Sequence, residues 1–203
     1  MALNPRVIKT VIDLVSVAVR TAPKSGGVDD VFFMDATRQK TAISREMRRL
    51  GKAIASKKTD HELAHAITLD WASDADTVQR SDGLILIGVD GKHALGANCG
   101  GCGFKDCAAF NKNKERASHA LMGGPFCTFK ILDLGIALGS AVETLSDLHV
   151  DNRIMYKIGV VAGRLKLAKA DPLIGIPLSV TGKNIYFDRM EKLVARAIFN
   201  KQR

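Results

Sequence analysis

The four cysteines restrict this chain more than any other feature, because residues so close in sequence must meet in space if they share a function. Cys99, Cys102, Cys107 and Cys127 have the spacing C-x2-C-x4-C-x19-C. Disulfides do not require a close trio with a distant fourth cysteine, whereas cubane iron–sulfur clusters often use one. Thiolate sulfur also selects iron–sulfur clusters, zinc and cuprous copper over hard cations. We therefore expect these four residues to bind one iron–sulfur centre.

Glycines surround the first two cysteines. Gly100, Gly101 and Gly103 have no β-carbon, so the backbone can turn sharply there and bring N–H groups close to a cluster. N–H groups that bond to cluster sulfur tune its redox potential. The residues from Ala108 to Arg116 are typical of a helix, which places Cys107 near the positive end of a helix dipole, where a thiolate is favoured.

Two other interpretations of the cysteines remain open. A structural zinc site with four cysteines usually consists of two short C-x2-4-C knuckles, and Cys107 and Cys127 are too far apart to form the second one. The four thiols could also be unrelated core residues, since free cysteine often behaves as a small hydrophobe. The clustering of three cysteines among glycines argues against that interpretation.

These residues resemble known iron–sulfur domains. The segment NCGGCGFKDCAAF is similar to the small 4Fe-4S domain of the B subunit of ion-pumping electron-transport complexes and of the large subunit of the corrinoid iron–sulfur protein. Over its length, the chain resembles a family of uncharacterised prokaryotic proteins described as containing a ferredoxin domain. That resemblance implies one 4Fe-4S cluster bound by Cys99, Cys102, Cys107 and Cys127. The resemblance over the whole chain rests on the segments RTAPKSGGVDD (Arg20–Asp30), LGIALGSAV (Leu134–Val142), VDNRIMYKIG (Val150–Gly159), GIPLS (Gly175–Ser179) and GKNIYFDR (Gly182–Arg189).

The length of 203 residues predicts a single domain, 1–203, that buries about 70% of its unfolded surface without help from a metal. The Cys-rich segment, residues 92–128, is then functional and does not serve to hold the fold together. The first residues, MALNPRVIKTVIDL, show no cleavable signal, and no apolar run reaches the ~20 residues that span a bilayer. We expect a cytoplasmic protein without membrane contact, in a reducing compartment that keeps thiols available.

The net charge of +9 raises the question of nucleic-acid binding. Basic residues are concentrated in Arg38–Lys58, on a segment with helical character. Aromatic residues for base stacking are missing nearby and no recognition motif is present, so we regard a solvated basic face as the better interpretation. The partners we expect are an unidentified redox protein and, as a further option, a second copy of the chain.

Periodicity predicts an α/β (or α+β) fold with a mixed central sheet flanked by helices and a Cys-rich, cluster-binding excursion after a central strand. The run Leu84–Val89 is continuous and apolar, as in a buried strand. The remaining predicted strands are Val31–Met34, Ile174–Val180 and Asn184–Phe187. The predicted helices are Pro5–Arg20, Thr37–Lys57, Asp60–Ala72, Phe129–Leu148, Asn152–Lys169 and Met190–Asn200.

The order of elements is also similar to that of nitroreductase-like flavoproteins. An N-terminal helix runs into the Ala22-Pro23 turn, Asp133, Gly135 and Ala137 fit a helix that opens with DxGxA, and a Gly175-Ile176-Pro177 segment follows. The resemblance implies FMN as a second cofactor and a flavin-dependent oxidoreductase as an alternative function. The arginine-rich N-terminal signature that holds the flavin phosphate is missing from this sequence.

One motif suggests a different class of protein. The segment His61–His65 reads HELAH and matches the H-E-x-x-H pattern, in which two histidines bind zinc and the glutamate is the base of a metalloprotease. A third ligand would have to come from His93, Glu115 or His119. The competing interpretation is that Thr59 and Glu62 form a capping box at the start of a helix.

Taken together, the residues favour an iron–sulfur redox protein that works by one-electron transfer, as an electron carrier or as part of an oxidoreductase. Phosphate-binding loops and the serine hydrolase elbow are absent from the sequence. No catalytic residue can be assigned. The electron donor, the acceptor and the substrate are not encoded in any motif that we recognise.

Overall fold

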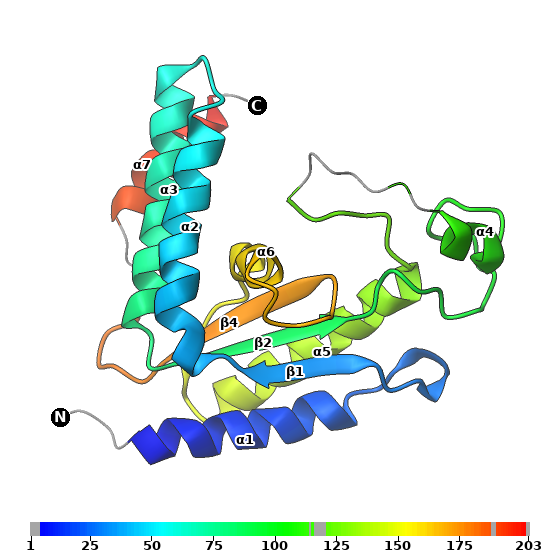
Figure 1. Ribbon diagram of the computed structural model, residues 1–203. Coiled ribbons are helices and arrows are strands. Elements are labelled where there is room, and N and C mark those ends of the chain that lie inside the picture. Colours follow the sequence, from blue (N-terminus) through cyan, green and yellow to red (C-terminus); the bar gives the residue numbers. More distant parts are fainter. Residues whose placement is uncertain (1–4, 114, 116–120, 188–189, 202–203) are drawn as a thin grey trace.

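The computed structural model of the protein describes residues 5–113, 115, 121–187 and 190–201. Its centre is a four-stranded sheet with the strand order β1-β2-β4-β3 (Figure 1). The strands are β1 (Val31–Asp35), β2 (Gly83–Val89), β3 (Asp151–Asn152) and β4 (Leu173–Ser179), and each neighbouring pair is antiparallel. An isolated bridge between Asp90 and Asp171 adds one parallel pairing. The expected α/β architecture, a central sheet flanked by helices, is confirmed.

Helices cover both faces of this sheet (Figure 1). Helices α1 (Pro5–Thr21) and α5 (Thr128–Asp147) pack side by side on one face. Helix α6 (Tyr156–Arg164) covers the other face together with the hairpin of α2 (Lys40–Ala55) and α3 (His61–Arg80). Helix α7 (Met190–Asn200) packs against α3. The shorter elements are α4 (Cys107–Lys112) and the 3-10 turns Ser25–Gly27 and Thr37–Gln39.

The position of strand β2 in the fold explains why polar and apolar residues do not alternate in its sequence. Every residue of β2 is buried, because helices pack on both faces of the sheet. Ile85, Ile87 and Val89 belong to the core beneath α1 and α5, whereas Leu84 and Leu86 belong to the core beneath α2 and α6. The prediction of a central buried strand from the apolar run is therefore confirmed.

Three predicted elements differ from the observed ones. The segment Asn184–Phe187 is a turn and not a strand, and the carbonyl oxygen of Tyr186 in it accepts a hydrogen bond from Arg153 at 3.2 Å. The helix predicted over Asn152–Lys169 begins only at Tyr156, because Asp151 and Asn152 pair with β4 as strand β3, and it ends at Arg164, because Lys166 has a left-handed φ of 54°. The helix predicted to end at Ala72 continues to Arg80 as α3.

A cluster of four charged side chains joins helices α3, α6 and α7. Asp70 and Asp74 lie one turn apart on α3, and both contact Lys157 of α6 and Lys192 of α7. The Nζ atoms of both lysines lie 2.8 Å from Asp74, and Lys157 also lies 5.1 Å from the centre of the Trp71 ring. Burial works against the charge on Asp74, but the two ammonium groups outweigh it and hold the pKa of this carboxyl below its usual value.

This arrangement predicts a loss of stability in acid. A carboxyl whose pKa is lower in the folded than in the unfolded state contributes stability above its unfolded pKa of about 3.9, and that contribution is lost as the pH falls through the folded value. Below about pH 4, the free energy of unfolding of the wild type should therefore fall more steeply than that of Asp74→Asn. Urea unfolding followed by circular dichroism between pH 7 and pH 3 measures both slopes. Equal slopes would contradict the role given to Asp74.

In the part of the chain that the structure describes, no helix combines the length and apolar character needed to cross a membrane.

Candidate metal centre

The four cysteines come together at one end of the sheet. Cys99 and Cys102 lie in the loop that follows β2, Cys107 is the first residue of α4, and Cys127 immediately precedes α5. All four line one small hollow, in which Leu95 and Phe104 are among the apolar neighbours. The loop and α4 project from the body of the protein beyond the end of β2 (Figure 1). The structure thus brings together all four residues predicted as ligands, and their role as ligands stays a prediction.

The hollow is closed on one side and open on the other. Cys127 is 4% exposed, Cys102 and Cys107 are half-buried, and Cys99 is exposed. None of the four is in a disulfide. A group bound by these thiols would be anchored at Cys127 against the protein body and would face solvent near Cys99, the side from which a redox partner can approach.

Two of the cysteines are placed by helix starts. Cys107 opens α4, where the carboxylate of Asp106 caps the helix by accepting a hydrogen bond from the Ala109 N–H at 2.7 Å. Cys127 is the N-cap residue of the long helix α5, and its own N–H donates to the carbonyl oxygen of Gly91 at 2.8 Å. The helix predicted after Cys107 is confirmed as far as Lys112, but it ends there, because Asn113 has an extended backbone and Glu115 is not helical; Lys114 and Arg116 lie outside the described residues.

Asn98 is a residue of the site that sequence reasoning missed. Its backbone N–H donates to Sγ of Cys107 at 3.3 Å, and its side-chain oxygen accepts from the N–H of Cys107 at 2.9 Å. Asn98 has a φ of 49°, a left-handed conformation that asparagine adopts more readily than most residues. The only sign of this role in the sequence is that an asparagine stands directly before the first cysteine. Its N–H thus donates to the sulfur of a predicted ligand, and hydrogen bonds to ligand sulfur tune the redox potential of a cluster.

Two glycines of the loop are required by its shape. Gly100 has a φ of 70°, which a side chain would strain, and a turn closes from its carbonyl oxygen to the N–H of Gly103 at 2.9 Å. A β-carbon on Gly101 would lie 2.8 Å from Oγ1 of Thr128, the first residue of α5. The loop with Cys99 and Cys102 can therefore approach the start of α5 only because Gly101 has no side chain.

The neighbouring loop between α1 and β1 supports the same end of α5. The buried carboxylate of Asp133 accepts hydrogen bonds from the backbone N–H and the hydroxyl of Ser25, at 2.8 and 2.7 Å. The buried ammonium group of Lys130 pairs with Asp30 of that loop. The segment Arg20–Asp30 and the first turns of α5, which are about a hundred residues apart in sequence, are thereby held next to each other.

The donor set of the site can be compared with those of a single metal ion and of an iron–sulfur cluster. In residues 5–113, 115, 121–187 and 190–201, no three His, Cys, Asp or Glu side chains are placed to hold one. A four-cysteine zinc site needs all four sulfurs about 2.3 Å from one ion. A cubane cluster instead spreads its thiolate ligands over separate iron atoms, so sulfurs distributed around a hollow suit it better. The donor set of four thiols fits an iron–sulfur cluster.

The HELAH segment gives no support to a zinc protease. His61, Glu62 and His65 are exposed on the first turns of α3, and Glu62 forms an ion pair with Lys201 at 2.9 Å. The capping-box prediction is wrong, because Asp60 and not Thr59 is the N-cap, accepting from the Leu63 N–H at 3.0 Å. The carboxylate of Asp60, one residue after Thr59, is the hydrogen-bond acceptor at this helix start. His119, named above as a third ligand, lies outside the described residues.

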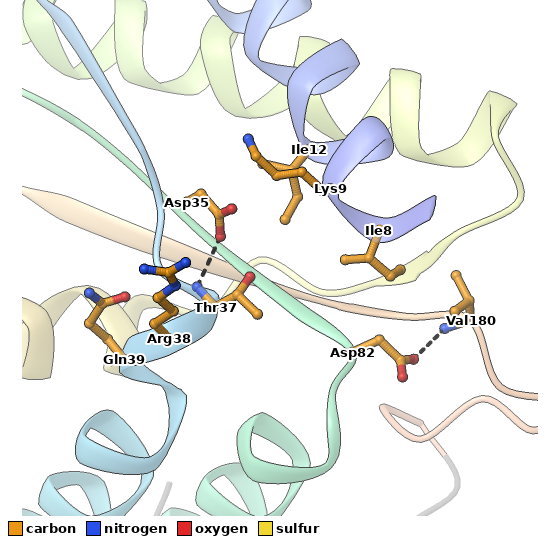
Figure 2. Close-up of a pocket in the computed structure, with 9 residues that line it drawn as sticks. All are labelled: Ile8, Lys9, Ile12, Asp35, Thr37, Arg38, Gln39, Asp82 and Val180. Atoms are coloured by element: carbon orange, nitrogen blue, oxygen red, sulfur yellow. Dashed lines mark hydrogen bonds between the residues drawn. The ribbon is translucent and has the colours of Figure 1, made fainter. Parts of the chain in front are cut away.

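A second cavity lies at the other end of the sheet (Figure 2). It has a volume of about 700 Å³ and lies between α1 and the ends of the strands. Asp35, at the end of β1, accepts from the Thr37 N–H at 3.0 Å, and Asp82, just before β2, accepts from the Val180 N–H at 2.8 Å. The length of β2 separates this cavity from the cysteines by roughly 20 Å. Besides these two carboxylates, the basic side chains of Lys9 and Arg38 also line the cavity, so it holds charges of both signs.

Comparison with known proteins identifies relatives of this chain. Residues 123–189 match the model of a family described as "Uncharacterized protein containing a ferredoxin domain". An uncharacterized protein from Archaeoglobus fulgidus is 38% identical over 187 residues, which are 91% of this chain and 93% of that protein.

The fold is similar to that of solved nitroreductases. Nitroreductase A from Vibrio parahaemolyticus has a TM-score of 0.50 and 11% identity, over 91% of this chain and 61% of its own. The NfrA1 nitroreductase from B. subtilis has a TM-score of 0.50 and 12% identity, over 95% of this chain and 71% of its own. The chain thus spans about three-fifths of the Vibrio enzyme. At this identity the likeness shows a nitroreductase-like fold and nothing about activity.

Proposed function

Because this chain belongs to the family of uncharacterized proteins containing a ferredoxin domain, we propose that it is an iron–sulfur protein that carries single electrons. The observation that supports the proposal is the convergence of all four cysteines, from a loop and two helix starts, on one hollow. A 4Fe-4S cluster would supply one-electron chemistry at this position.

Different residues of the chain would have different roles at such a site. Cys99, Cys102, Cys107 and Cys127 would hold the cluster, with Cys127 fixed between Gly91 and α5. The Asn98 N–H would offset negative charge on the sulfur of Cys107. The exposed edge at Cys99 would be the place where electrons enter and leave, by contact with a redox protein.

The test of this proposal is reversible reduction. Anaerobically purified protein should lose its brown colour on addition of dithionite, show the electron paramagnetic resonance signal of one unpaired electron, and regain its colour with a mild oxidant. Protein that holds iron and sulfide but cannot be reduced and reoxidised would rule out a role as electron carrier.

The nitroreductase-like fold supports a second candidate, in which the chain also holds FMN and is part of an oxidoreductase. Its support is the fold alone. Denaturation of purified protein distinguishes the two candidates. Release of about one FMN per chain would favour the flavoenzyme, and failure to bind added FMN would leave the electron carrier.

A further inference from the structure

The cavity at the far end of the sheet from the cysteines has the composition of a ligand site. Its volume of about 700 Å³ lies within the range of about 300–1,000 Å³ that is typical of small-molecule sites. Ile8 and Ile12 of α1 give it an apolar wall, and a small number of charged side chains line the rest. Figure 2 shows Asp35 and Arg38 toward one end of the cavity and Asp82 toward the other.

Both carboxylates of the cavity are held in place and still have capacity to accept hydrogen bonds. One oxygen of Asp35 accepts from the Thr37 N–H at 3.0 Å, and one oxygen of Asp82 accepts from the Val180 N–H at 2.8 Å. Within the part of the chain that the structure describes, the second oxygen of each carboxylate accepts no hydrogen bond. Two fixed carboxylates with a spare oxygen suit a ligand that carries an ammonium group.

At one end of the cavity, a cation and an amide are also available. Arg38 is exposed on the 3-10 turn Thr37–Gln39, and no carboxylate of the described residues lies within 4 Å of its guanidinium nitrogens. The Oε1 atom of Gln39, on the same turn, is buried and receives no hydrogen bond from the residues that the structure describes. A guanidinium group can bind a carboxylate through two parallel hydrogen bonds, and the Gln39 oxygen can accept from an N–H group.

The charges around the cavity balance, although the chain as a whole carries a net charge of +9. The ammonium group of Lys9 pairs with Asp13, and Lys40 lies close enough to Asp82 for the carboxylate to attract it. The cations at and beside the cavity are thereby matched in number by carboxylates, and the two sets are Lys9, Arg38 and Lys40, and Asp13, Asp35 and Asp82. Such a site does not favour a polyanion, whereas a ligand with one charge of each sign can satisfy both ends.

The strand register gives the length of a matching ligand. Asp35 pairs with Ile85 across β1 and β2, and Asp82 precedes Ile85 by three residues, so the two carboxylates lie about 10 Å apart along the strand. Arg38 is at the Asp35 end of the cavity (Figure 2). An extended tripeptide is about 10 Å long, with its ammonium group at one end and its carboxylate at the other.

We propose that this cavity binds a small zwitterionic peptide, with the ammonium group of the peptide on Asp82 and its carboxylate on Arg38. An apolar side chain in the middle of the peptide packs against Ile8 and Ile12, and a peptide N–H reaches the Oε1 atom of Gln39. The inference does not rest on the proposed electron-transfer function, because the cavity and the four cysteines lie at opposite ends of β2.

The experiment is isothermal titration calorimetry of the full-length, metal-loaded protein with the tripeptide Gly-Leu-Gly as the probe. The wild type should bind the free tripeptide saturably, and Arg38→Gln and Asp82→Asn should each raise the dissociation constant about 10-fold, because each removes a charge-assisted hydrogen bond. The N-acetylated tripeptide has no ammonium group, so it should bind more weakly to the wild type and no more weakly to Asp82→Asn. The C-terminal amide of the tripeptide should be insensitive to Arg38→Gln in the same way.

Arg45→Gln is the matched control. It removes the same charge as Arg38→Gln from an exposed position of α2 that does not line the cavity, and it should bind the tripeptide like the wild type. Asp82→Asn should fold, because asparagine keeps an oxygen that can accept from the Val180 N–H, and circular dichroism checks this. The proposal is overturned if the wild type does not bind the free tripeptide at millimolar concentration, if it binds the acetylated peptide equally well, or if Arg45→Gln weakens binding as much as Arg38→Gln.

Discussion

Replacing Cys102 with alanine should remove the cluster from this protein. The expected iron content falls from about four atoms per chain to less than one, together with the loss of the brown absorption, because each thiolate holds one iron of the cubane and its loss weakens the binding of the whole cluster. Cys102 is half-buried on a loop at the edge of the hollow, so the fold should survive the change. Metal analysis and the absorption spectrum of anaerobically prepared protein measure the effect.

A histidine variant serves as the control for this experiment. His65→Ala removes an exposed side chain from the HELAH segment, which the structure places on α3 and away from the four cysteines. It should retain iron and colour at the wild-type level. Full iron content in Cys102→Ala, or loss of metal in His65→Ala, would show that the ligands have been misidentified.

Replacing Gly159 with alanine should give the largest loss of stability of any single methyl group added to this fold. A β-carbon at Gly159 of α6 would lie 1.6 Å from the carbonyl oxygen of Leu173 in β4, which is backbone and cannot rotate away. The helix would have to lift from the sheet, at a cost of about 3 kcal/mol or more in the free energy of unfolding. Urea unfolding followed by circular dichroism gives this value.

Gly163→Ala is the matched comparison, one turn further along the same helix. The added methyl group meets nothing within 4 Å, so alanine should stabilise the protein by about 0.5–1 kcal/mol through its better helix propensity. If both variants lose stability equally, the close contact between α6 and β4 is not as the structure has it.

Strong local patterns made most of the fold predictable. The helical recurrence of Pro5–Arg20, the apolar run Leu84–Val89 and the terminal helix Met190–Asn200 are confirmed with small changes at their ends. Elements that depend on distant partners were not predictable. Strand β3 has only two residues and exists because Asp151 and Asn152 pair with the end of β4, which no local periodicity reveals.

The site was predictable to a similar degree. The spacing of the cysteines indicated that they would share a site, and the glycines indicated a tight loop. The sequence could not reveal that Gly101 makes room for Thr128, or that Asn98 bonds to Cys107, because both contacts depend on how the loop folds back on itself and on α5. The support of α5 by Ser25 and Asp30 likewise joins segments about a hundred residues apart.

The most direct test of the central claim is a metal and sulfide analysis of protein purified without oxygen, combined with its absorption spectrum. We predict about four irons and four sulfides per chain and a broad brown absorption band. A colourless protein that holds zinc or no metal, and that stays colourless after incubation with iron and sulfide, would contradict the assignment of Cys99, Cys102, Cys107 and Cys127 as cluster ligands.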